Sequence, residues 1–338
     1  MRLLLPTAGN RSIILDIWRK TSNVEKVITT EIDPLAPGIL CADKCYQVSR
    51  SDSAEFADEV NAICRMESID LIVPMADLDL IFFSRERERF LGSGTDILVA
   101  GKKAIDISVD KLKTFEFFES LGIPTPSTIL LRDGLENIGS IHYPQYLKPR
   151  YVSMKNSSRY LFALIENSYD LEYYGRKLNA EHDSYLLQEY LGFGKEINVD
   201  FFVQDTELKR IVTLYRLKAG QGGGITRGQT IPCHPRIMGF VENILDYMGF
   251  FGPANIQVYD LGNGSFKVTE INPRFSNSAA LCVHAAGVDY FDLTVRMLNG
   301  ERIVPEFDNY KMIYATTGLH RLVVEKPEFE GGRNDKDA

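Results

Sequence analysis

The stretch Gly252–Leu281, GPANIQVYDLGNGSFKVTEINPRFSNSAAL, predicts two antiparallel strands that are joined by a tight turn. Asn263-Gly264 is a strong signal for a two-residue hairpin turn. A turn at these residues fixes one register, and the expected opposed pairs are Gln257–Glu270, Asp260–Lys267 and Leu261–Phe266. The apolar pair and the oppositely charged pair are both favourable cross-strand partners, which supports this register.

Alternation along the strands then predicts which side chains share one side of the hairpin. The expected set is Gln257, Tyr259, Leu261, Phe266, Val268, Glu270 and Asn272. An amide, a carboxylate and a second amide lie at its open end, and such oxygens suit Mg²⁺ when phosphates supply the other ligands. Arg274 follows and could bind a phosphate oxygen. The alternative is an ordinary hairpin whose polar end residues are solvated.

GPANIQ and TEINPRFSNSAAL resemble the nucleotide-binding half of the ATP-grasp ligases, most closely a synthetase unit of the carbamoyl-phosphate synthase large subunit. The resemblance implies a role for four residues of the hairpin. Gln257, Glu270 and Asn272 would hold Mg²⁺ on ATP, with Mn²⁺ as the alternative ion. Arg274 would contact phosphate or substrate, so Arg274 and Asn272 are the expected catalytic residues.

Composition is typical of a globular protein, because 44% of the 338 residues are hydrophobic and 25% are charged. The net charge of −8 argues against a nucleic-acid surface. No apolar run is long enough for a membrane span, and MRLLLPTAGN has too short an apolar core for a signal peptide. Five cysteines without CxxC spacing favour a reduced, cytoplasmic protein.

The first hundred residues alternate buried strands with helical patterns, which predicts a small parallel sheet flanked by helices. A single Gly9 follows the first strand, so the GxGxxG signature of dinucleotide binding is missing. No P-loop spacing is present either. In the resembling ligases this domain forms one wall of the active-site cleft. Asp77 and Asp79 follow the strand DLIVP as candidate ligand contacts, although helix capping is the favoured interpretation.

Asp110-Lys111 begins an amphipathic helix that ends near Gly122, and IPTPS then predicts a linker with a domain boundary close to Pro126. In the resembling family a basic residue at the start of this helix reaches ATP, and Lys111 occupies that position. The alternative for Lys111 is an ordinary surface lysine.

Residues 146–200 predict a small α+β lid, in which Lys148 ends a strand. The resemblance places Lys148 on the α- or β-phosphate of ATP. The following loop, YVSMKNSSR, departs from the family because it lacks the usual glycines. We expect its small and basic residues to replace them, namely Ser153, Lys155, Ser157 and Ser158.

The segment LLQEYLGFGKEINVDFFV carries the expected nucleoside contacts. The resemblance implies that Glu189 and the main chain around Leu191 contact adenine, and that Glu196 holds the ribose. The glycine-rich loop 218–230 is a flexible surface loop on composition alone, but it matches the loop that lines the acceptor region in the family. Thr226 stands where a histidine is common, and Arg216 and Arg227 are candidates to bind a substrate carboxylate.

The sequence thus predicts an α/β domain with a parallel sheet, followed by an α+β ATP-grasp fold with two subdomains. The expected units are 1–110, a connecting helix at 111–125, a lid at 126–190, a C-terminal subdomain at 191–325 and a disordered tail at 326–338. The expected function is ATP-dependent ligation of a small carboxylate to an amine through an acyl phosphate. Two alternatives are a subunit of a split carbamoyl-phosphate synthase and an ATP-binding regulatory protein without turnover. Neither nucleic acid nor a membrane is an expected partner, and homodimerisation is left open.

Overall fold

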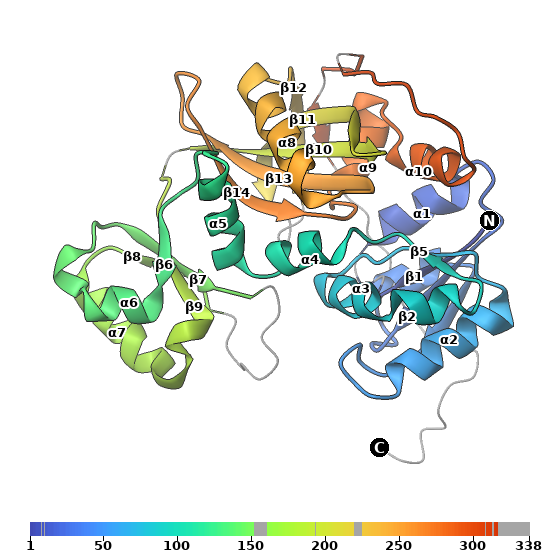
Figure 1. The fold of residues 1–338 in the computed structure, drawn as a ribbon, viewed down its shortest axis with the longest axis horizontal. Helices are drawn as coiled ribbons and strands as arrows, with labels where there is room; N and C mark the ends of the chain where they lie inside the picture. The colour runs from blue at the N-terminus through green and yellow to red at the C-terminus, as the bar shows by residue number, and fades with distance from the viewer. Residues whose placement is uncertain are drawn as a thin grey trace.

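The computed structural model describes residues 1–7, 9, 11–151, 161–192, 194–219, 225–307, 309–312 and 314–316. Within these residues, the strands form three sheets. Figure 1 shows the first sheet in blue to cyan, the second in green to yellow-green and most of the third in yellow and orange. The expected disordered tail and the glycine-free loop YVSMKNSSR, apart from Tyr151, lie outside the described residues.

The N-terminal sheet is parallel and has the strand order β3-β2-β1-β4-β5. Its strands are β1 (Arg2–Pro6), β2 (Lys26–Glu31), β3 (Lys44–Gln47), β4 (Leu71–Ile72) and β5 (Asp96–Ile97). The apolar run Leu3–Leu5 is fully buried, as expected for a parallel strand with both faces covered. The covering helices are α1 (Ser12–Lys20), α2 (Phe56–Glu67), α3 (Asp77–Leu91) and α4 (Lys102–Ser108). The predicted parallel α/β unit is confirmed.

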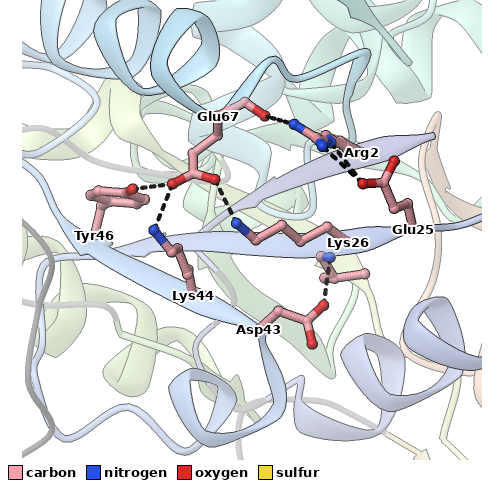
Figure 2. Close-up of polar contacts among 8 residues, drawn as sticks. Arg2, Glu25, Lys26, Asp43, Lys44, Tyr46 and Glu67 are labelled. Carbon is pink, nitrogen blue, oxygen red and sulfur yellow. Dashed lines mark hydrogen bonds and ion pairs between the residues drawn. The ribbon is translucent and has the colours of Figure 1, made fainter.

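A buried carboxylate ties the amino ends of two of these strands to the end of α2. Glu67 accepts hydrogen bonds from Lys26 Nζ at 2.7 Å, from Lys44 Nζ at 3.0 Å and from the Tyr46 hydroxyl, as Figure 2 shows. Burial of Glu67 opposes ionisation, but these donors outweigh it and hold the pKa of Glu67 at about 2. The cluster therefore favours the charged carboxylate and fixes α2 on the sheet.

The second sheet is small and antiparallel, with the strand order β6-β9-β7-β8. Its strands are β6 (Thr128–Leu130), β7 (Gln145–Pro149), β8 (Ala163–Ile165) and β9 (Tyr185–Glu189), and its helices are α6 (Leu131–Glu136) and α7 (Ser168–Leu178). It has a core of its own around Leu147, Leu171 and Leu187. Helix α5 (Lys111–Ser120) leads into this sheet, and Asp110 caps it by accepting a hydrogen bond from Leu112 N at 3.1 Å.

The third sheet is antiparallel, with the strand order β14-β13-β10-β11-β12-β15. Its strands are β10 (Lys195–Gln204), β11 (Glu207–Ala219), β12 (Ile225–Ile231), β13 (Gly252–Asp260), β14 (Phe266–Asn272) and β15 (Tyr314–Thr316). The helices of this part are α8 (Pro235–Met248), α9 (Ala279–Leu281), a π-helical turn at Cys282–Ala286 and α10 (Tyr290–Leu298). No helix among the described residues is both long and apolar enough to cross a membrane.

The first and third sheets share their hydrophobic cores, whereas the second does not. Trp18 of α1 packs edge-to-face on Phe275 and Phe291, with ring centroids 5.4 and 5.0 Å apart. Such buried aromatic contacts join α1 to the segment after β14 and to α10. The N-terminal domain and the large sheet therefore form one packed body, against which the small sheet is placed.

Candidate active site

A cleft of about 980 Å³ lies between the small sheet and the large sheet. Strands β7 and β9 form one wall, and the start of β10 together with β11, β13 and β14 forms the other, while residues 190–192 and 194 line the connection between them. The sequence-predicted residues that line this cleft are Lys111, Lys148, Glu189, Leu191, Glu196, Gln257 and Glu270. Seven of the nine predicted site residues therefore meet in one cavity, although they come from distant parts of the chain.

Lys148 supplies a buried cation on the small sheet. It is 8% exposed, and its Nζ donates to Gln188 Oε1 at 2.8 Å. Burial, together with the nearby charge of Lys111, lowers the pKa of Lys148 to about 8, although Glu270 opposes this effect. An anion in the cleft would stabilise the charged amine, so this position suits a phosphate group.

Lys111 opens helix α5, which is fixed to the small sheet by an ion pair. Arg150 Nε and Nη2 each donate to a different oxygen of Asp110 at 2.8 Å, and Lys111 N donates to Arg150 O at 2.9 Å. Such bidentate pairs hold a fixed geometry. The start of α5 is therefore tied to the end of β7, which brings Lys111 and Lys148 to the same cleft.

The hairpin of β13 and β14 places Gln257 opposite Glu270, as predicted, and both line the cleft. The turn is also confirmed, since Asn263 and Gly264 have φ angles of 53° and 71° and Ser265 N donates to Gly262 O at 3.0 Å. Near the turn the predicted register is wrong, because Leu261 N donates to Ser265 O and the pairing slips by one residue. The observed pairs there are Asp260–Phe266 and Tyr259–Lys267.

A β-bulge at Thr269 restores the predicted register further along the hairpin. Gln257 pairs with Glu270 but Val258 pairs with Val268, so Thr269 has no opposed residue. Phe266 and Val268 consequently face the hydrophobic core instead of the cleft, and their predicted position beside Gln257 is wrong. The bulge separates an apolar half of β14 from the polar half that carries Glu270.

Asn272 and Arg274 lie behind the cleft wall rather than in it. Asn272 is 8% exposed; its Nδ2 donates to Asn255 Oδ1 at 3.4 Å, and its Oδ1 accepts from Arg274 Nη2 at 3.1 Å. The Asn272 oxygen that was predicted as a metal ligand is thus engaged by a guanidinium. The metal and catalytic roles of these two residues stay predictions.

Arg274 forms an ion pair with Asp77, and Asp77 lines the cleft. Arg274 Nε donates to Asp77 Oδ1 at 2.7 Å. Burial would raise the pKa of Asp77, but the charge and hydrogen bond of Arg274 lower it overall, so both partners stay ionised. The favoured capping interpretation is wrong for Asp77, because this residue binds Arg274, which lies 197 positions away. It is supported for Asp79, which hydrogen-bonds the backbone of Ala76 at the start of α3.

The opposite end of the cleft carries the residues predicted to bind the nucleoside. Lys267 Nζ donates to both oxygens of Glu189 at 2.5 Å, and Ser127 N donates to Glu189 Oε2 at 3.1 Å. Arg216 Nη1 donates to Glu196 Oε1 at 2.5 Å. Glu189 therefore joins the small sheet to β14, and its adenine role and the ribose role of Glu196 stay predictions.

Aromatic side chains in this cleft were missed by the sequence analysis. Tyr146 and Phe162 stack with their ring centroids 6.1 Å apart, and Tyr215 and Tyr259 line the other wall. Alternation could have identified Tyr146, which lies two residues before Lys148 on the same face of β7.

The glycine-rich loop is described only in part. Residues 220–224 and the side chain of Thr226 lie outside the described residues, and the side chain of Arg227 is exposed.

Two family models match separate parts of the chain. The first is described as PylC-like, N-terminal domain and matches residues 3–98. The second is described as ATP-grasp in the biosynthetic pathway with Ter operon and matches residues 181–318. The first match covers nearly all of the parallel sheet, and the second covers all strands of the large sheet.

Relatives and solved structures agree with these models. The chain is 23% identical to a carbamoyl-phosphate synthase of Methanobrevibacter smithii over 89% of this chain and 82% of that protein. It is 24% identical to the carbamoyl phosphate synthase large chain of Clostridium acetobutylicum over 88% of this chain, but spans only 26% of that protein. The structure resembles N5-carboxyaminoimidazole synthetase from Staphylococcus aureus complexed with ADP, with a TM-score of 0.71 and 18% identity over 92% of this chain and 79% of that one.

Proposed function

We propose, on the premise that this chain belongs to the ATP-grasp superfamily, that it is an ATP-dependent carboxylate–amine ligase that forms an acyl phosphate. The observation that carries this proposal is the cleft between the two antiparallel sheets. It brings two lysines from one side to a glutamine and a glutamate from the other. This combination of cations and oxygen ligands is the one that a magnesium-bound triphosphate requires.

The cations and the metal ligands have separate tasks. Lys111 and Lys148 neutralise phosphate charge, and a bound phosphate would offset the burial and the repulsion from Lys111 that lower the pKa of Lys148. Gln257 and Glu270 hold Mg²⁺, which polarises the γ-phosphate when bound. The described residues contain no group of three or more His, Cys, Asp or Glu that could bind a metal alone. One carboxylate and one amide fit an ion whose remaining ligands are phosphate oxygens and water.

The nucleoside occupies the end of the cleft formed by Glu189, Leu191 and Glu196. Tyr146 and Phe162 offer an apolar wall there, as a purine base requires. The Glu189–Lys267 pair closes this end between the two sheets. Asn272 and Arg274 act from behind the wall, where Arg274 orients Asp77 toward the reacting end.

The reaction joins the two substrates in two displacements. A carboxylate oxygen attacks the γ-phosphorus of ATP, and the bond to the ADP oxygen breaks. The amine nitrogen then attacks the acyl carbon, the bond to the phosphate oxygen breaks, and the nitrogen gives up a proton. No side-chain nucleophile is needed, because positioning and fixed charges supply the acceleration.

Phosphate release from MgATP, measured with a panel of carboxylates and amines and coupled to mass spectrometry, tests the proposal. We expect one pair to yield a C–N product, and the Glu270→Gln variant to lose turnover while it keeps its fold. Lys113→Met, which removes a charge from the exposed side of α5, is the matched control. Carbamoyl phosphate formed from bicarbonate and ammonia would favour a carbamoyl-phosphate synthase subunit instead. MgATP binding without phosphate release for any pair would favour a regulatory protein.

The three sheets support the proposed division into 1–110, 111–125, 126–190 and 191–325 as functional units. The five cysteines form no disulfide in the described part of the chain, which suits the proposed cytoplasmic location. A homodimer is the proposed oligomeric state to be tested, and measurement of the molecular mass in solution decides between monomer and dimer.

A further inference from the structure

A second cavity of about 290 Å³ lies at the carboxyl end of the N-terminal parallel sheet. Residues that follow β1, β2 and β3 line it, together with the start of α3. The polar side chains used below are Thr7, Arg11, Glu31, Asp77 and Asp79. Asp77 also lines the cleft, so the two cavities adjoin at one carboxylate. Ligands of open parallel sheets bind at this edge.

Asp79 is a buried carboxyl group whose hydrogen bonding is incomplete. It is 1% exposed, and its Oδ1 accepts from Thr7 Oγ1 at 3.2 Å. Its Oδ2 has no hydrogen-bond partner among the described residues. Burial raises the pKa of Asp79 to about 7, although Thr7, Arg11 and a hydrogen bond from the backbone of Ala76 oppose this effect. A buried oxygen of this kind costs free energy unless a donor reaches it, and the cavity beside it leaves room for one.

The other charged groups of this cavity have both signs. Glu31 is 4% exposed and accepts a hydrogen bond from Gly9 N, and burial raises its pKa. Arg11 Nη1 donates to Thr7 O at 3.2 Å, and burial lowers the pKa of Arg11. Both residues are thus held in poorly solvated positions. A ligand with a cationic donor and an anionic group would complement them.

We propose that this cavity binds the amine substrate of the ligation as its ammonium ion, with Asp79 and Glu31 as the carboxylate contacts. This inference rests on the proposed function. The ammonium gives one proton to the Asp79 carboxylate, and the freed lone pair attacks the acyl carbon. The bond from this carbon to the phosphate oxygen breaks, and the nitrogen gives its second proton to the departing phosphate to leave the neutral amide. Arg11 favours an amine that also carries a carboxylate, so small amino acids are the preferred class. Asp77, at the junction of the two cavities, faces the path from amine to acyl phosphate.

Calorimetry on the full chain, with MgATP replaced by a nonhydrolysable analogue, tests the site without turnover. The probes are α-amino acids, simple alkyl amines, D-ribose and adenosine. We expect an amino acid to bind, and Asp79→Asn and Glu31→Gln each to weaken its binding at least tenfold, because a hydrogen bond to a charged group is lost. Asp33→Asn is the matched control, since Asp33 is exposed and does not line the cavity. Nucleotide affinity should be unchanged in all three variants.

The outcomes separate this inference from the ligase proposal. Amine binding that is unchanged in both cavity variants overturns the inference, even if the enzyme forms an amide. Binding of ribose or adenosine in place of amines, or binding of no amine at all, also overturns it. Asp79-dependent amine binding in a protein that never releases phosphate supports the cavity and rejects only the ligase activity. Circular dichroism shows whether Asp79→Asn and Glu31→Gln are folded. If one of them does not fold, amine binding by the other still tests the inference.

Discussion

Replacement of Lys148 by methionine should remove a pH dependence from nucleotide binding. Lys148 has a pKa of about 8 in the empty protein, because it is buried and lies near Lys111. A bound triphosphate restores the charged form. Binding near pH 8 must therefore be accompanied by proton uptake, and the affinity must fall as the pH rises above the pKa of the empty site.

The size of the effect follows from the two pKa values. The interval between about 8 and the ordinary value of 10.5 corresponds to roughly 3 kcal/mol by which burial and Lys111 disfavour the charged form of Lys148, and the phosphates must offset this penalty to restore the ordinary pKa. Lys148 is about nine-tenths protonated at pH 7 and about one-tenth protonated at pH 9, so affinity should fall about tenfold between them. At pH 8 each nucleotide should take up about half a proton.

Isothermal titration calorimetry with a nonhydrolysable ATP analogue, in buffers of different ionisation enthalpy, measures both quantities. Lys148→Met should bind more weakly at pH 7 and should lose the proton uptake near pH 8. Lys113→Met removes the same charge from an exposed position of α5 and should behave as the wild type. The loss of the Lys148 donor leaves Gln188 Oε1 without this partner, so thermal unfolding must be recorded for each variant.

Two results would refute this reasoning. The first is wild-type binding near pH 8 without proton uptake, because a lysine with the assigned pKa could not then contact the phosphates. The second is a Lys148→Met variant that keeps the wild-type nucleotide affinity at pH 7 and still shows the tenfold fall in affinity between pH 7 and pH 9. The pH dependence would then come from the nucleotide itself. Either result would show that Lys148 does not contact the nucleotide, without contradicting the fold of the small sheet.

Three further predictions concern stability and metal binding. Glu67→Gln should lower the free energy of unfolding in urea by about 2 kcal/mol at pH 7. Because the pKa of Glu67 is lowered to about 2, its contribution is present above pH 4.5 and lost as the pH falls toward 2, so the variant should lack that loss. Glu270→Gln should reduce the gain in nucleotide affinity on adding Mg²⁺ at least tenfold, as read by calorimetry with and without the ion. Gly134→Ala should destabilise by about 1 kcal/mol because the new methyl group overlaps Leu187, while Gly139→Ala, with open space, should not.

The central hairpin was predictable because its determinants are local. Asn263-Gly264 fixes the turn, and the pair Gln257–Glu270 follows from it. The one-residue shift beside the turn and the bulge at Thr269 were not predictable. The bulge offsets the shift, so the pair Gln257–Glu270 has the same register with or without them. Gly262, with a φ of 87°, permits the slip, and core packing of Phe266 and Val268 requires it. Alternation alone therefore assigned these two side chains to the wrong face.

Long-range partners account for the other failures of the sequence analysis. Asp77 was expected to cap a helix, because two acidic residues in a first turn are typical of capping. Its partner Arg274 is brought to it by the packing of α1 against the segment after β14, which no local pattern encodes. Glu189 likewise has a partner that no local pattern encodes, because Lys267 comes from a strand of a different sheet, and its adenine role stays a prediction.

The Asp77–Arg274 pair joins the two proposed half-reactions. Asp77 lines both cavities, and Arg274 binds Asn272 on the strand that carries Glu270. A change at either cavity that neutralises Asp77 would leave a buried guanidinium unpaired, which is costly. Because Trp18 fixes α1 to this same region, the proposed amine cavity and the proposed metal ligands belong to one packed body. The small sheet has a separate core, so its contribution to the cleft depends on contacts such as Glu189–Lys267 rather than on shared core packing.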